Sequence, residues 1–176
     1  MSDVGHKPRP PKPVTASYLR NAALGYLRQR AASRAMLRTT LKRRALRRLQ
    51  VKRLEPEIEA AIERAIEALA AEKFVDDATF ARGRRVTLQA KGLPRRRIAL
   101  GLRQKGIEAE TIEATLGDDI DDVVQARRYA ERRRFGPWSR KADTPDQRRK
   151  DLAAMVRAGF SYGVVQKAFA AIVDDA

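Results

Sequence analysis

A short segment with a glycine corner recurs along this chain, and it limits the possible fold more than any other feature. The clearest copy covers residues 93–116, LPRRRIALGLRQKGIEAETIEATL. Ile98 and Leu102 are four residues apart, so they share one face of a helix. Gly106 suits the left-handed position that closes a helix, and the acidic stretch around Ile112 follows it. The segment therefore predicts a basic helix, a tight corner and a short acidic helix.

The same pattern occurs before and after this copy. Gly159 aligns with Gly106 in the later copy, and Ala45 falls at the corner position in the earlier one. The sign of the charge alternates with the pattern. Residues 17–54 contain twelve Lys and Arg and no acid, whereas residues 106–122 contain seven acids and no base. Units that recur in this way and are stabilised mainly by their neighbours form repeat proteins.

We therefore predict an all-α protein, an elongated, curved array of three tandem three-helix repeats. The predicted bounds are 17–75, 76–117 and 118–176. A disordered, basic, proline-rich tail is predicted over 1–16, because this segment lacks the apolar residues that a core requires. No stretch shows the sustained alternation of apolar and polar residues that indicates a sheet.

Capping signals mark where several helices should begin. The first helix is predicted over 18–30, and Ser33 is expected to cap the second. Pro94 is expected at the first position of the helix in the best copy. Thr144 should begin a later helix with a capping box, after a loop over 135–143. Three valines are among the residues expected to face the interior: Val86, Val124 and Val156.

The formal net charge of +16 predicts an acidic partner, because so basic a surface repels itself. Nucleic acid is the commonest such partner, and an acidic groove on another protein comes next. The chain contains no cysteine, which excludes disulfides and thiolate metal sites and suits the cytoplasm. No apolar run approaches the roughly 18 residues of a membrane span. We expect a cytoplasmic protein that does not enter a membrane.

Motifs for chemistry are missing from the sequence. There is no GxxxxGK[ST] phosphate loop, no cluster of metal ligands and no nucleophile with a histidine base. The single histidine, His6, lies in the predicted tail. The acidic run over 118–122 could hold a divalent ion, but acids at the start of a helix more often serve as caps and dipole partners. We expect a protein that is not an enzyme and has no metal and no cofactor.

Four segments resemble the RecX family, the regulatory proteins of the RecA recombinase. The middle repeat contains FVDDATFAR at 74–82 and GLPRRRIALGLRQKGI at 92–107. The third contains RRKDLAAMVRAGFS at 148–161, and the first contains YLRQRAASRAMLRTTLKRR at 26–44. The resemblance covers about residues 17–173, and the order and spacing of its pieces make it more specific than any single piece.

The resemblance implies a regulatory protein that binds the RecA filament on single-stranded DNA. Family members lie along the helical groove of that filament and modulate, usually inhibit, its ATPase, strand-exchange and coprotease activities in recombination, DNA repair and the SOS response. The implied partners are the RecA filament and single-stranded DNA, with duplex DNA as a further candidate, and a monomer is expected. The residues by themselves leave open a second hypothesis, a general DNA- or RNA-binding protein built of helix-turn-helix-like units.

Basic side chains at the same place in the repeats are the binding candidates. Their contacts with phosphates would be largely independent of sequence and steeply dependent on salt. DNA phosphates and acidic patches of RecA are both open as their partners. Trp138 and Tyr162 are the aromatic residues that could stack on bases. The candidates are Arg95, Arg96, Arg97, Arg103, Lys105, Arg132, Arg133, Arg134, Arg148, Arg149 and Lys150.

Overall fold

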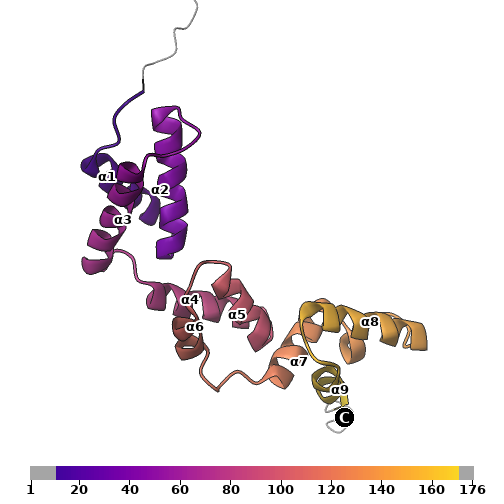
Figure 1. Cartoon of the computed structure of the whole chain (residues 1–176). Helices are drawn as coiled ribbons and strands as arrows, with labels where there is room; N and C mark the ends of the chain where they lie inside the picture. The colour runs from indigo at the N-terminus through magenta and orange to yellow at the C-terminus, as the bar shows by residue number, and fades with distance from the viewer. Residues whose placement is uncertain (1–10, 171–176) are drawn as a thin grey trace, which may run out of the picture. The chain divides into compact units, whose positions relative to one another are not determined.

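A computed structural model describes residues 11–170, and every regular element in this range is a helix (Figure 1). The prediction of an all-α protein is therefore confirmed for these residues. Contacts divide the chain into two units, with the boundary after Asp77. Most of the predicted tail, residues 1–10, lies outside the described residues. The predicted bounds of the three repeats stay a prediction.

The first unit is a bundle of α1 (Ala16–Leu27), α2 (Arg34–Leu49) and α3 (Pro56–Ala71). The helix α1 begins two residues before the predicted start because Thr15 accepts a hydrogen bond from the Tyr18 N–H. Ser33 caps α2 in the same way, as predicted, by accepting from the Met36 N–H at 3.1 Å. The largest fully buried side chains of this core are Leu19, Leu37, Leu41, Ile62, Ile66 and Leu69.

The corner of the first copy differs from the other two. Ala45 is fully buried inside α2, and the helix continues to Leu49. Gln50 then takes the left-handed conformation, with φ of 57°. The chain therefore turns about one helical turn later than in the copies with a glycine, because alanine at the corner position continues the helix.

The second unit begins with a bundle of α4 (Asp77–Gln89), α5 (Arg95–Arg103) and α6 (Ala109–Leu116). Pro94 precedes α5 as its N-cap in an extended conformation, so the prediction that it occupies the first helical position is wrong by one residue. Gly106 has the left-handed φ, 72°, that the corner requires. The fully buried residues of this core are Ala81, Ile98, Leu102, Ile112 and Leu116.

The second unit continues with α7 (Asp122–Arg133), a 3₁₀ turn η1 (Gly136–Trp138), α8 (Pro145–Ala158) and α9 (Tyr162–Ala170). The helix α8 begins as predicted, with Thr144 accepting from the Gln147 N–H. The second half of the capping box is replaced, because the Gln147 amide donates to Asp151 at 2.7 Å instead. The third core contains Ala126, Ala130, Met155, Phe160, Val165 and Ala168.

Two glycines fit the second and third bundles together. A Cβ added at Gly92 would lie 2.7 Å from the Tyr129 backbone nitrogen on α7. A Cβ added at Gly159 would lie 2.7 Å from Cγ of Arg97 on α5. Arg132 also donates to the Ala90 carbonyl at 2.8 Å. The corner after α4 and the corner after α8 therefore pack closely against the neighbouring bundle.

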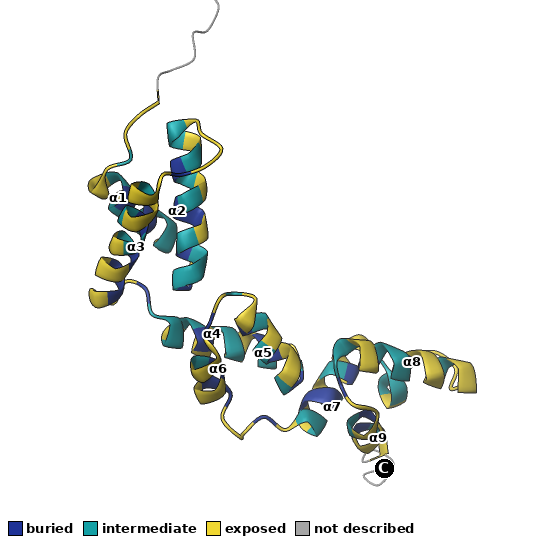
Figure 2. Cartoon of the chain, in the orientation of Figure 1, coloured by how far each residue is buried: buried dark blue, intermediate teal, exposed yellow. Residues whose placement is uncertain are grey.

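The three valines predicted to face the interior are exposed, so that prediction is wrong. Val86 is 65% exposed, Val124 47% and Val156 46%. Helical geometry explains the correction, because α4 buries Leu88 and the side chain two residues earlier points to the other side. Likewise α8 buries Met155, the immediate neighbour of Val156. Figure 2 shows buried and exposed positions following one another along the same helices.

Candidate functional site

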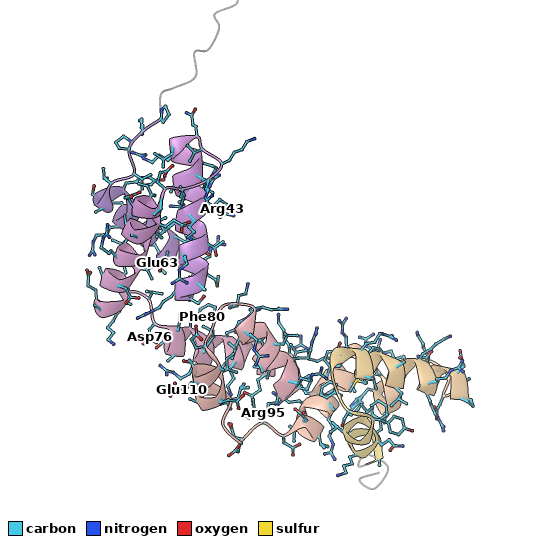
Figure 3. The ribbon with its side chains drawn as sticks, viewed as in Figure 1. Arg43, Glu63, Asp76, Phe80, Arg95 and Glu110 are labelled. Carbon is cyan, nitrogen blue, oxygen red and sulfur yellow. The ribbon has the colours of Figure 1, made fainter. Side chains whose placement is uncertain are left out.

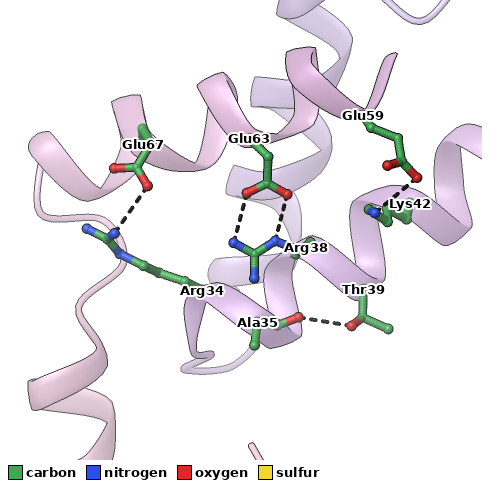
Figure 4. A network of polar contacts seen from close by, with 8 residues as sticks. All are labelled: Arg34, Ala35, Arg38, Thr39, Lys42, Glu59, Glu63 and Glu67. Carbon is green, nitrogen blue, oxygen red and sulfur yellow. Dashed lines mark hydrogen bonds and ion pairs between the residues drawn. The ribbon is translucent and has the colours of Figure 1, made fainter. Parts of the chain in front are cut away.

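Several of the basic side chains that the sequence predicts to be available form ion pairs with acids of the described residues. In the first unit, α2 and α3 lie side by side and their opposite charges form a ladder (Figure 4). Because Arg38 donates two hydrogen bonds to Glu63, the pKa of that carboxyl is lowered. The acidic stripe of α3 is thereby stabilised by the basic helix before it. The pairs of the ladder are Arg34–Glu67 at 3.2 Å, Arg38–Glu63 at 2.6 Å and Lys42–Glu59 at 3.0 Å.

Two more arginines of α2 hold its bundle together. The Arg44 guanidinium donates to the Ala22 carbonyl at 2.8 Å. Arg48 donates to the Pro13 carbonyl and lies 4.0 Å from the centre of the Tyr18 ring. Arg43, which Figure 3 labels, is exposed and forms no ion pair with a described residue. Most of the charge on α2 is therefore structural.

Arg95, the first of the predicted candidates, is tied into the second unit. Its guanidinium donates to Glu113 at 2.9 Å and to the Gly117 carbonyl. Its backbone N–H donates to Asp122 at 2.8 Å. The side chain is 33% exposed and lies at the start of α5 (Figure 3). Arg95 therefore joins α5 to α6 and to the first residue of α7.

The candidates on α8 are paired with nearby acids. Arg148 forms an ion pair with Asp143. Arg149 and Lys150 both contact Asp146, at 2.9 and 2.7 Å. Their hydrogen bonds lower the pKa of Asp146, that from Lys150 more than that from Arg149. These exposed cations remain on the surface, but each has an acid beside it.

Two of the three candidates at the end of α7 have side-chain contacts within the fold. Arg132 donates to the Ala90 carbonyl, and Arg133 lies 5.8 Å from the centre of the Tyr129 ring. Arg134 ends the helix in a left-handed conformation. Lys105 is partly buried at the end of α5.

Three of the predicted candidates, Arg96, Arg97 and Arg103, lie together in a groove with an arginine that sequence reasoning missed. Arg157 completes this set from α8. None of the four forms an ion pair with a residue in the described part of the chain. The groove has a volume of about 530 Å³. Its lining consists of Arg96, Arg97, Ala99, Leu100, Arg103, Val156, Arg157 and Gly159, which we call the arginine groove.

The arginine groove combines positive charge with apolar surface. Its lining contains no acid, and guanidinium groups bind carboxylates and phosphates through paired hydrogen bonds. Leu100 is 39% exposed and Val156 46% exposed. Gly159 lets the Arg97 side chain lie across the α8 corner, since a Cβ there would meet Arg97 at 2.7 Å. The groove can therefore accept an anionic group next to an aliphatic one.

Comparison with characterised sequences identifies the family. The chain is 36% identical over 165 residues to regulatory protein RecX of Myxococcus xanthus, covering 91% of this chain and 88% of the relative. The chain belongs to the RecX family. A second regulatory protein RecX, from Agrobacterium fabrum, is 31% identical over 161 residues. The alignment covers 91% of this chain and 86% of the relative.

Solved structures have the same fold. The crystal structure of RecX from Lactobacillus salivarius superposes with a TM-score of 0.62 at 23% identity, covering 87% of this chain and 93% of that one. A crystal structure of a regulatory protein RecX gives a TM-score of 0.61 at 20% identity, covering 86% and 70%. At these identities the comparison concerns the fold alone. It supports the interpretation of this chain as a series of three-helix units.

The sequence profile of the RecX second three-helix domain matches residues 76–116, which contain α4 to α6. Three of the four groove arginines lie inside this RecX segment, and Arg157 lies outside it. Arg157 could not be found from the repeat, because it aligns with the uncharged Gln104 when Gly159 is placed on Gly106.

Most other candidate features of this RecX family member have contacts within the fold. Trp138 is partly buried against the third core, so it anchors its loop, whereas Tyr162 is 54% exposed. In the acidic run, Asp121 caps α7 and Asp119 forms an ion pair with Arg85. A second hollow of about 410 Å³ between α4 and α6 contains the acid Glu110, so its charge is mixed.

None of the described helices is long and apolar enough to cross a membrane.

Proposed function

We propose that this protein regulates a RecA filament on single-stranded DNA and lowers its ATPase, strand-exchange and coprotease activities. We further propose that the arginine groove docks on that filament. Membership of the RecX family supports the proposal, because its relatives are named regulatory proteins. The observation that carries the docking site is the set of four groove arginines without an acidic partner among the described residues.

A charge that already has an acidic neighbour contributes less to an external partner than an unpaired one, because the new contact replaces an existing one worth up to about 1 kcal/mol. The ladder of α2 and α3 and the pairs on α8 fall in this class. The groove arginines have no such competitor among the described residues. Their electrostatic attraction to an acidic surface is therefore available for binding.

The test is a titration of the protein into RecA on single-stranded DNA, with ATP hydrolysis as the readout. The wild-type protein should lower the ATPase rate and bind the preformed filament better than naked DNA. The variant Arg96→Ala/Arg97→Ala/Arg103→Ala should need a higher concentration for the same effect. All three side chains are exposed, so the stability of the variant should stay within about 0.5 kcal/mol of wild type.

A matched control removes the same number of charges from paired residues of the same unit. The variant Arg148→Ala/Arg149→Ala/Lys150→Ala should inhibit nearly as well as wild type. If both triple variants lose the same amount of RecA inhibition, net charge alone determines binding to the filament and the groove is not the docking site. If RecA activity is unchanged at saturating protein while duplex DNA is bound tightly and sequence-specifically, the general nucleic-acid-binding hypothesis replaces this one.

A further inference from the structure

We propose that the arginine groove binds an acidic protein segment that carries an aliphatic side chain, rather than a nucleic-acid backbone. This inference rests on the proposed function, because the filament offers both protein and DNA surfaces to the groove. The inference is that the groove contacts the protein surface of the filament and not its DNA. The argument depends on the order of charged and apolar groups, on their exposure and on the aromatic residues.

The first observation is the order of side chains along α5. Arg96, Leu100 and Arg103 follow an i, i+4, i+7 spacing, so they form one strip on the helix face. The strip places an aliphatic side chain between two guanidinium groups. Across the groove, α8 presents Val156 beside Arg157. Both walls therefore pair a positive charge with an aliphatic side chain.

The second observation is the exposure of the aliphatic groups. Leu100 and Val156 are 39% and 46% exposed, although Leu102 and Met155 nearby are completely buried. Covering apolar surface is favourable in proportion to the area removed from water. A sugar-phosphate backbone would satisfy the arginines but leave this apolar surface without a matching group. A segment with carboxylates on either side of a Leu, Ile or Val satisfies both.

The third observation concerns aromatic residues. Proteins that bind single-stranded nucleic acid combine a basic groove with aromatic side chains on which bases stack. The lining of the arginine groove contains no aromatic residue. Trp138 is packed on the third core, and Tyr162 lies on α9 outside the lining. The composition of the groove therefore favours a protein ligand over a single strand.

The decisive variant is Leu100→Gln/Val156→Thr, which keeps all four arginines and the net charge. Its affinity for the preformed RecA filament on single-stranded DNA should fall about tenfold, equivalent to 1.4 kcal/mol. Its affinity for a naked oligo-dT strand should be unchanged. The single variant Val156→Thr conserves side-chain shape and should give a smaller change in the same direction. It serves as the test if the double variant fails to fold.

A second measurement does not need RecA. A fluorescent peptide of repeated Glu-Leu-Glu should bind the wild-type protein more tightly than polyglutamate of equal charge. The Leu100→Gln/Val156→Thr variant should lose this preference while still binding polyglutamate. Equal binding of the two peptides by wild type would mean that the groove selects charge alone, and the inference would be overturned.

The two proposals fail in different ways. If the wild-type protein inhibits RecA but the aliphatic variant binds the filament normally, the inference is wrong and the proposed function stands. Equal losses of filament and oligo-dT binding by the arginine triple variant, with a flatter salt dependence, would assign the groove to phosphates. If the wild-type protein leaves RecA unaffected, the proposed function fails, and the peptide measurement still decides the chemistry of the groove.

Discussion

Gly92→Ala should be among the most damaging small substitutions in this protein. Gly92 has a φ of 73° at the corner between α4 and α5, a conformation that side chains with a Cβ rarely adopt. The added methyl group would also lie 2.7 Å from the Tyr129 nitrogen and 3.0 Å from the Gln125 oxygen. Both are backbone atoms of α7, so they cannot move aside as the end of a flexible side chain could.

Two contributions determine how far Gly92→Ala lowers the free energy of unfolding. The left-handed backbone disfavours alanine by about 1 kcal/mol. Overpacking against a rigid neighbour typically costs about 1–3 kcal/mol. We expect Gly92→Ala to lower the free energy of unfolding of the second unit by about 2–4 kcal/mol. Because the clash lies between the second and third bundles, the loss should extend to the third.

Urea denaturation followed by tryptophan fluorescence measures this loss, because the only tryptophan, Trp138, belongs to the third bundle. Gly83→Ala is the matched control in α4. A Cβ at Gly83 meets nothing within 4 Å, so alanine there should stabilise the helix by about 0.5–1 kcal/mol. A loss below about 0.5 kcal/mol for Gly92→Ala would mean that this corner does not pack tightly on α7, and the reasoning would be refuted.

Three further predictions test the cores and the charge ladder. Leu102→Ala removes a fully buried side chain and should lower stability by about 2–5 kcal/mol in the same urea assay; a loss similar to that of an exposed leucine would contradict the burial. Asp151→Ala should destabilise the third bundle by about 1–3 kcal/mol, because the buried carboxylate accepts a hydrogen bond from the Gly136 N–H at 2.8 Å. Trp138 fluorescence should report the loosened loop. Glu63→Gln should lower stability at pH 7 by about 0.5 kcal/mol, since the paired side chains are about 41% exposed and screened. The folded-state pKa of Glu63 is lowered, so its contribution is present above the unfolded-state pKa of about 4.3. Urea titrations at several pH values should therefore show wild type and variant converging as the pH falls through the folded-state pKa, and a constant difference would exclude the ion pair as the cause.

Local signals in the sequence predicted the helical units and several of their ends. Ser33, Thr144 and the corner glycines act within one turn of their own position, so the residues around them are sufficient to predict their roles. The family resemblance was also available from the sequence, because it depends on ordered motifs. The three misplaced valines show the limit of this reasoning, since the face that a helix buries depends on the helices packed against it.

Only the tertiary structure decided which basic residues remain available to a partner. Arg95 and Arg96 are adjacent in the sequence, yet Arg95 pairs with Glu113 and Arg96 lines the groove. Arg157 joins Arg103 from a different helix, which no repeat alignment indicated. The composition determined a net charge of +16 and hence an acidic partner. Whether a given charge is free depends on distances of a few ångströms between groups far apart in the chain, because ion pairing weakens with distance in space and not in sequence.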